Sequence, residues 1–127
     1  MESVLLVDDE PDILETLADL LELEFPDVEI RKARNAQEAL DMMAESVPDV
    51  LLSDHQMPGM NGLDFLAEAQ RRHGPLNTIL LTAYDQRDGA MKAAREGVVR
   101  RYYAKPPDVQ AVLDGIRELL HPDSIAG

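Results

Sequence analysis

The chain has no cysteine and no tryptophan, and aromatic residues make up only 4% of its 127 residues. The lack of cysteine excludes disulfide bonds, thiolate metal sites and a cysteine nucleophile. No apolar run approaches the roughly 18 residues of a membrane-spanning helix, and the N-terminus lacks the basic segment and cleavage site of a secretory signal. We therefore expect a cytoplasmic protein that does not enter a membrane.

Basic residues are also scarce. The 12 lysines and arginines stand against 25 aspartates and glutamates, for a net charge of −13. Because affinity for nucleic acid comes largely from basic side chains at phosphates, direct binding to nucleic acid is not expected. A hydrophobic content of 45% separates the chain from disordered acidic tails. Its length fits one domain, since domains cluster around ~100–150 residues.

The hydrophobic pattern predicts alternating strands and helices. Short apolar or β-prone segments predict strands over residues 4–7, 28–31, 50–53, 78–82 and 101–104. Apolar residues at helical spacing predict helices near residues 13–21, 36–43, 63–69, 86–96 and 109–120. Such alternation is typical of an α/β fold with a parallel sheet and helices on both faces. We expect the domain over residues 1–121, with residues 122–127 as a tail or linker stub.

Polar residues follow the predicted strands. Asp8 and Asp9 come after the first strand, Asp54 after the third, Thr82 closes the fourth and Lys105 follows the fifth. Because the carboxyl ends of parallel strands meet at one edge of a sheet, we expect these side chains to lie close together. Three neighbouring carboxylates raise one another's pKa unless cations compensate them.

A hard divalent cation would supply that compensation together with Lys105. Mg²⁺ prefers carboxylate, carbonyl and phosphate oxygens. Zinc is disfavoured, because there is no cysteine and the three histidines are scattered. The sequence therefore predicts Mg²⁺ as the cofactor.

The same groups suit the transfer of a phosphoryl group to a carboxylate. Asp54 is the lone carboxylate at the end of its strand and is the predicted nucleophile. Asp8 and Asp9 are adjacent and are better suited to holding the metal. The Lys105 ammonium and the Thr82 hydroxyl can bind phosphoryl oxygens.

These residues lie in motifs that closely resemble the receiver domain of two-component response regulators, such as the chemotaxis regulators. The motifs are Val7-Asp8-Asp9-Glu10-Pro11, Asp54 followed by Met57-Pro58-Gly59-Met60-Asn61-Gly62, Leu81-Thr82-Ala83, and Lys105-Pro106. The resemblance implies a doubly wound (βα)5, flavodoxin-like sheet of strand order 2-1-3-4-5. It covers nearly the whole chain.

The resemblance also implies that a sensor histidine kinase or a phosphotransfer protein phosphorylates Asp54. The ligands that it implies for Mg²⁺ are Asp9, Asp54 and the backbone carbonyl of Gln56, with Asp8 acting partly through water. The Lys105–Pro106 peptide is a candidate for the cis isomer.

Tyr102 matches the aromatic switch position of the family. The resemblance implies that Thr82 moves towards the phosphate and that Tyr102 then turns inward. The surface of the fourth helix, fifth strand and fifth helix would change its affinity for an output domain or effector protein, and a homodimer is possible. Since Tyr102 and Tyr103 alternate along their strand, one is expected to face inwards and the other outwards.

The sequence argues against two other functions. A Mg²⁺-dependent phosphatase or phosphotransferase would need a second aspartate two residues after its nucleophile, but Gln56 stands there and has no proton to give. A degenerate receiver that only binds partners is opposed by the complete set of site residues. We therefore expect no separate substrate turnover. His55 is expected to point away from Asp54, and Gly59 and Gly62 are expected to serve the turn through backbone freedom.

Overall fold

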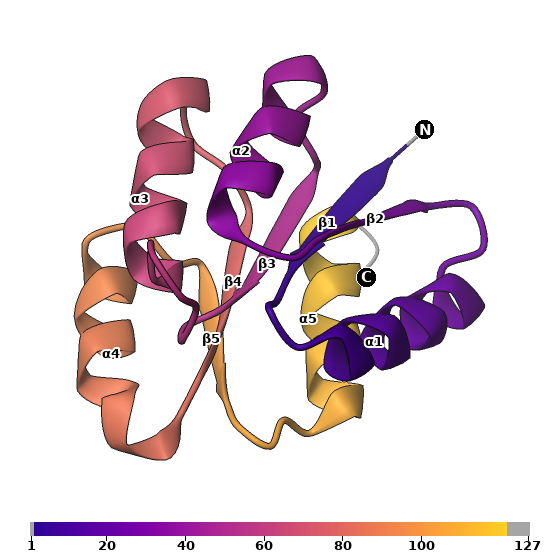
Figure 1. The fold of residues 1–127 in the computed structure, drawn as a ribbon. Helices are drawn as coiled ribbons and strands as arrows, with labels where there is room; N and C mark the ends of the chain where they lie inside the picture. The colour runs from indigo at the N-terminus through magenta and orange to yellow at the C-terminus, as the bar shows by residue number, and fades with distance from the viewer. Residues whose placement is uncertain (1, 122–127) are drawn as a thin grey trace.

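The computed structural model describes residues 2–121, so the predicted tail, residues 122–127, lies outside the described residues. Five parallel strands form one sheet of order β2-β1-β3-β4-β5. The strands are β1 (Ser3–Val7), β2 (Glu29–Ala33), β3 (Val50–Asp54), β4 (Thr78–Thr82) and β5 (Arg101–Ala104). The α-helices are α1 (Pro11–Glu24), α2 (Ala36–Glu45), α3 (Gly62–His73), α4 (Arg87–Arg95) and α5 (Val109–Leu120), and a short 3-10 helix, η1 (Tyr84–Gln86), precedes α4. The predicted fold class and strand order are confirmed (Figure 1).

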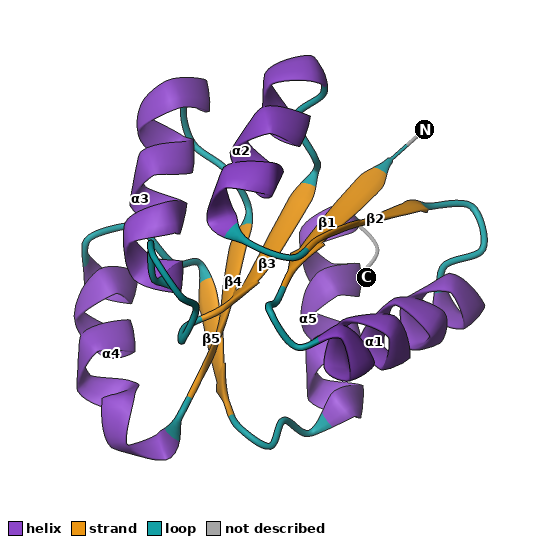
Figure 2. Ribbon diagram, in the orientation of Figure 1, coloured by secondary structure: helices purple, strands orange, loops and turns teal. Residues whose placement is uncertain are grey.

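Helices cover both faces of the sheet. Helices α1 and α5 lie on one face and α2, α3 and α4 on the other (Figure 2). Each face has its own hydrophobic core, because side chains alternate between the two faces along each strand. On β1, for example, Val4 and Leu6 belong to the core under α1 and α5, whereas Leu5 and Val7 belong to the core under α2, α3 and α4.

The buried central strands have clearer hydrophobic patterns than the partly exposed edge strand β2. Every residue of β1, β3 and β4 is buried, as their unbroken apolar runs indicate. The edge strand β2 is partly exposed and contains Arg31 and Lys32, so its pattern was too polar to define its end. Pairing with β1 extends β2 to Ala33, which lies opposite Val7.

The prediction for the two tyrosines of β5 was wrong. Tyr102 packs against the core under α2, α3 and α4, and Tyr103 packs against the opposite core. Both side chains are partly buried, because helices cover the sheet on both sides even at this edge strand.

Helix caps fix where the helices begin beside the carboxyl ends of the strands. The side chains of Asn35, Asn61 and Asp108 each accept a hydrogen bond from a backbone N–H in the first turn of α2, α3 and α5, respectively. Helix α1 has no such side-chain cap and begins at Pro11, which fits the first turn. The edge of the sheet that carries the polar residues is thereby built from well-defined turns.

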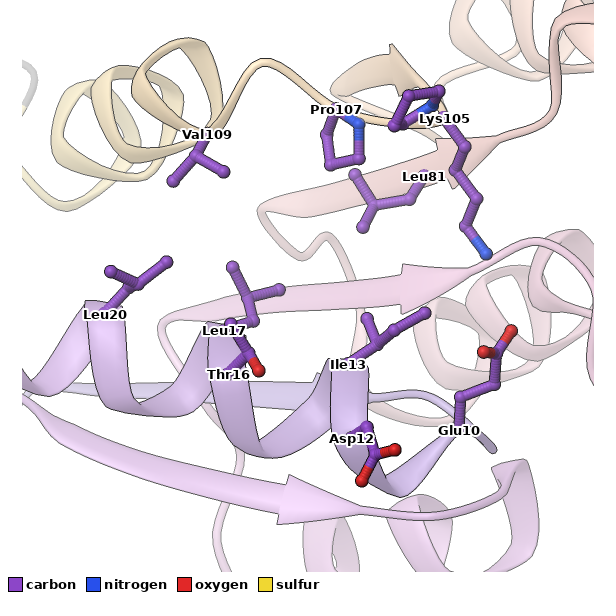
Figure 3. A pocket seen from close by; sticks show the side chains of 11 residues that line it. Glu10, Asp12, Ile13, Thr16, Leu17, Leu20, Leu81, Lys105, Pro107 and Val109 are labelled. Atoms are coloured by element: carbon purple, nitrogen blue, oxygen red, sulfur yellow. The ribbon is translucent and has the colours of Figure 1, made fainter.

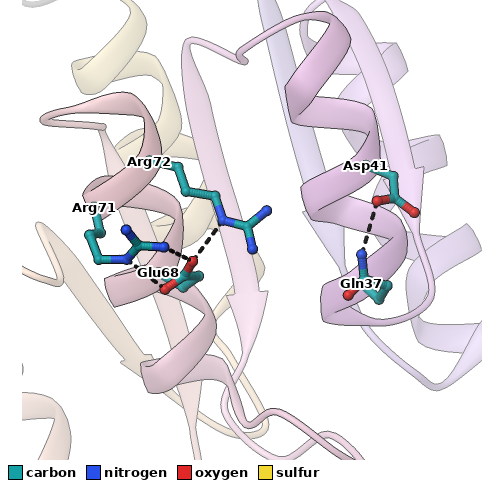
Figure 4. A network of polar contacts seen from close by, with 5 residues as sticks. All are labelled: Gln37, Asp41, Glu68, Arg71 and Arg72. Atoms are coloured by element: carbon teal, nitrogen blue, oxygen red, sulfur yellow. Dashed lines mark hydrogen bonds and ion pairs between the residues drawn. The ribbon is translucent and has the colours of Figure 1, made fainter.

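One carboxylate, that of Glu68, forms ion pairs with two arginines near the end of α3. Glu68 accepts hydrogen bonds from Arg71 and Arg72 (Figure 4). These hydrogen bonds, that from Arg71 first, lower the pKa of Glu68 to about 2. Positive charge at a helix C-terminus also interacts favourably with the helix dipole.

Among residues 2–121, no helix has both the length and the apolar composition needed to cross a membrane.

Candidate functional site

Three carboxylates meet at the carboxyl edge of the sheet. Asp8 follows β1 and Asp54 ends the neighbouring strand β3, since Val7 pairs with Ser53. One oxygen each of Asp8, Asp9 and Asp54 lies within 4.8 Å of the others. Asp8 and Asp54 are buried, whereas Asp9 is exposed. The predicted gathering of these residues is confirmed.

The environment of Asp8 disfavours its charged form. The pKa of Asp8 is raised from 3.8 to about 6, mainly by burial and also by the nearby charges of Asp54 and Asp9. The backbone N–H of Glu10, which donates to Asp8 Oδ1 over 2.9 Å, and the charge of Lys105 act in the opposite direction. A bound cation would favour the ionised carboxylate.

This raised pKa predicts that Asp8→Asn stabilises the protein when no metal is present. The pKa of Asp8 is higher in the folded state than in the unfolded state, so this group makes the folded state less stable as the pH rises from about 4 to about 7. We expect a gain of about 1–3 kcal/mol in the free energy of unfolding near pH 8, and a smaller gain near pH 5.

The measurement is urea denaturation with a chelator present at both pH values. Asp19→Asn is the control, because Asp19 is exposed in the middle of α1. An Asp8→Asn gain that does not depend on pH would contradict the assigned cause.

Lys105 supplies a positive charge next to Asp54. Its Nζ forms an ion pair with Asp54 Oδ1, and its backbone N–H donates to the carbonyl oxygen of Thr82 over 2.9 Å. The Lys105–Pro106 peptide is cis, as the motif implied. Asp54 is buried, and the ion pair with Lys105 supplies only one positive charge to a cluster of three carboxylates. Such a set of carboxylate oxygens fits the ligands that Mg²⁺ prefers.

His55 contacts Thr82, a residue that the sequence did not link to it. Its Nδ1 lies 2.8 Å from the Thr82 hydroxyl, and both side chains are buried. Burial lowers the pKa of His55. The strand register explains the contact, because Asp54 pairs with Leu81 and the next residue of each strand therefore lies side by side. The pairing depends on the register of β3 with β4, which the sequence around His55 does not contain.

The whole sheet and its carboxyl edge match a known protein family. The family model described as a response regulator receiver domain matches residues 4–117. The chain belongs to this family.

Individual relatives agree with this assignment. The response regulator protein PilR of Pseudomonas aeruginosa is 35% identical over 119 residues, which are 94% of this chain and 25% of PilR. A receiver domain protein from Clostridium thermocellum has a TM-score of 0.87 at 28% identity, with 100% of both chains covered. The signal receiver domain of an HD domain-containing protein from Pseudomonas fluorescens has a TM-score of 0.84 at 33% identity, with 94% of both chains covered. This receiver thus spans only a quarter of the length of PilR.

The remaining predicted residues of the receiver lie around this edge. Gln56 is exposed in the loop after β3, two residues beyond Asp54. Tyr102 pairs with Leu80 in the sheet, on the same face as Thr82. Among the described residues, the Thr82 hydroxyl makes no hydrogen bond to Asp54.

An apolar groove opens beside Lys105. It has a volume of about 590 Å³ and lies between α1 and the start of α5 (Figure 3). Apolar side chains supply most of the lining, namely Ile13, Leu17, Leu20, Leu81, Pro106, Pro107 and Val109. Lys105 and Glu10 lie at one end of the groove, next to the carboxylates. A partner in this groove would therefore approach Asp54 from the side of α1.

Proposed function

We propose that this receiver accepts a phosphoryl group onto Asp54, in the cytoplasm, from the phosphohistidine of a sensor histidine kinase or phosphotransfer protein. The observation that carries this proposal is the buried Asp54 carboxylate, paired with Lys105 and adjacent to Asp8 and Asp9. An Asp54 oxygen would form the new bond to phosphorus while the bond from phosphorus to the donor imidazole nitrogen breaks. The donor histidine leaves as the neutral ring after it takes up a proton.

Four groups of this chain would hold the metal. Asp9, Asp54 and the backbone carbonyl of Gln56 are the proposed ligands, with Asp8 acting partly through water. When bound there, Mg²⁺ supplies positive charge that neutralises phosphoryl oxygens. The three clustered carboxylates, which face only one ammonium group, that of Lys105, support this assignment.

Lys105 and Thr82 would stabilise the transferred group. The Lys105 ammonium pairs with the Asp54 carboxylate before transfer and could bind a phosphoryl oxygen afterwards. The Thr82 hydroxyl has one proton to donate to another oxygen. Gln56 cannot protonate a leaving group, which supports a stable acceptor and no turnover of a separate substrate.

The partners are proposed from the surfaces around the site. The apolar groove between α1 and α5 suits an apolar helical surface of the phosphodonor, because it ends at Lys105 beside Asp54. Movement of Thr82 and Tyr102 would alter the α4-β5-α5 surface, through which the receiver would control an output domain, an effector protein or a second copy of itself.

The site of labelling tests this function directly. The chain is incubated with acetyl phosphate and Mg²⁺, trapped chemically, digested and analysed by mass spectrometry. We expect the label on Asp54 and a loss of labelling when a chelator replaces the metal. A label on Asp8 or Asp9, or labelling that is independent of Mg²⁺, would contradict the proposal.

A further inference from the structure

The contact between His55 and Thr82 holds a hydroxyl that the phosphoryl group needs. Both residues lie at the carboxyl ends of neighbouring strands, on the face covered by α2, α3 and α4. Their polar atoms are 2.8 Å apart, with exposed fractions of 7% for His55 and 0% for Thr82. A buried hydrogen bond of this length is well formed, and breaking it has a cost unless another partner is supplied.

The direction of the hydroxyl is set by where its partners lie. Its oxygen contacts His55 Nδ1 and, more weakly at 3.4 Å, the carbonyl oxygen of Ala83. Side chains alternate along β3, so Asp54 belongs with Val50 and Leu52 on the opposite face, under α1 and α5. The contact with His55 therefore holds the Thr82 hydroxyl on the face of the sheet opposite to that of Asp54.

We propose that His55 is a positioning residue that retains the Thr82 hydroxyl in the unphosphorylated receiver and thereby weakens the binding of a phosphoryl group at Asp54. This inference rests on the proposed function. A phosphoryl group shifts the receiver between two states only by the difference in its interactions with them. The His55 hydrogen bond belongs to the resting state alone, so its strength is subtracted from the apparent affinity for the phosphoryl group.

Two substitutions separate the hydrogen bond from the bulk of the ring. His55→Phe keeps an aromatic ring and removes the nitrogen, whereas His55→Asn keeps a hydrogen-bonding atom at the position of Nδ1. The probe is beryllofluoride, a phosphoryl mimic, titrated in the presence of saturating Mg²⁺. Since one hydrogen bond contributes a modest net amount, we expect His55→Phe to bind the probe about threefold to tenfold more tightly. His55→Asn should return the affinity towards that of the wild type.

Two further readouts distinguish positioning from a general change of the fold. The affinity for Mg²⁺ alone should not change in His55→Phe, because Thr82 is not a proposed metal ligand. In the wild type, the ¹⁵N NMR signals of the His55 ring should shift when beryllofluoride binds, because Nδ1 loses the hydroxyl. This second measurement needs no variant, so it decides the matter even where a substitution prevents folding.

The outcomes are distinct. Unchanged or weaker binding of beryllofluoride by a folded His55→Phe variant, or His55 ring signals that do not respond to the probe, would overturn the positioning role. Weaker binding would instead indicate that His55 assists the hydroxyl. Failure of the wild type to bind beryllofluoride, or equal binding by Asp54→Asn, would reject the proposed function itself.

Discussion

Asp54→Asn is expected to reduce phosphorylation by acetyl phosphate to the background of an unreacted sample. Asparagine has nearly the same shape as aspartate, but its amide is a poor nucleophile and cannot form the acyl phosphate. It also removes the negative charge that pairs with Lys105 and contributes to the metal cluster. The measurement is intact-mass analysis after incubation with acetyl phosphate and Mg²⁺, combined with beryllofluoride titration.

A matched control separates this effect from a general loss of negative charge. Asp85→Asn changes an exposed carboxylate in η1, close in sequence to Thr82 but outside the three-carboxylate cluster. We expect this variant to be labelled like the wild type. Persistent labelling of Asp54→Asn at the wild-type rate would show that another residue is the acceptor.

The sequence predicted the central sheet and the carboxylate cluster because both follow from the order of apolar and charged residues along the chain. β1, β3 and β4 are buried on both faces. A strand that is buried on both faces has a nearly continuous run of apolar residues in its sequence. The first charged residue after such a run, Asp8 or Asp54, then lies at the carboxyl edge by topology alone. Lys105 was placed at the same edge because it follows β5, although β5 is only partly buried and lacks such an apolar run.

What the sequence did not predict depends on register and on packing. The pairing of His55 with Thr82 follows from the register of β3 against β4. The hydrophobic pattern of either strand alone does not determine this register. The sequence predicted that the clustered carboxylates raise one another's pKa, but the largest cause of the raised pKa of Asp8 is its burial, which depends on packing. Both tyrosines of β5 are packed because helices reach the edge of the sheet on either side.

Gly62 was interpreted as a flexible turn residue, and the structure gives it a different role. Gly59 does have a positive φ of 79°, as a turn glycine would, but Gly62 does not. Gly62 lies at the start of α3, and its backbone N–H donates to the carbonyl oxygen of His55 over 2.8 Å. A methyl group there would overlap the carbonyl oxygen of Asp54 and lie 2.9 Å from His55 Cα. The glycine is needed because two backbone segments meet there.

Gly62→Ala is therefore expected to lower the free energy of unfolding by about 3 kcal/mol or more, which is the upper range for overpacking. The atoms in the way belong to the backbone that carries the acceptor, so they cannot rotate aside as a side chain would. The start of α3 and the end of β3 must separate, which moves Asp54 away from Lys105. We expect the remaining folded protein to bind beryllofluoride more weakly than the wild type. Urea denaturation and the beryllofluoride titration measure the two effects.

Gly89→Ala is the matched control, since it makes the same chemical change in a helix without a close contact. A methyl group on Gly89, in α4, would lie 3.7 Å from Leu63 Cδ1, an ordinary packing distance. Replacing a glycine inside a helix by alanine stabilises it by roughly 0.5–1 kcal/mol. The two variants should therefore shift stability in opposite directions. Equal effects would mean that the close approach at Gly62 is relieved by the loop and does not constrain the position of Asp54.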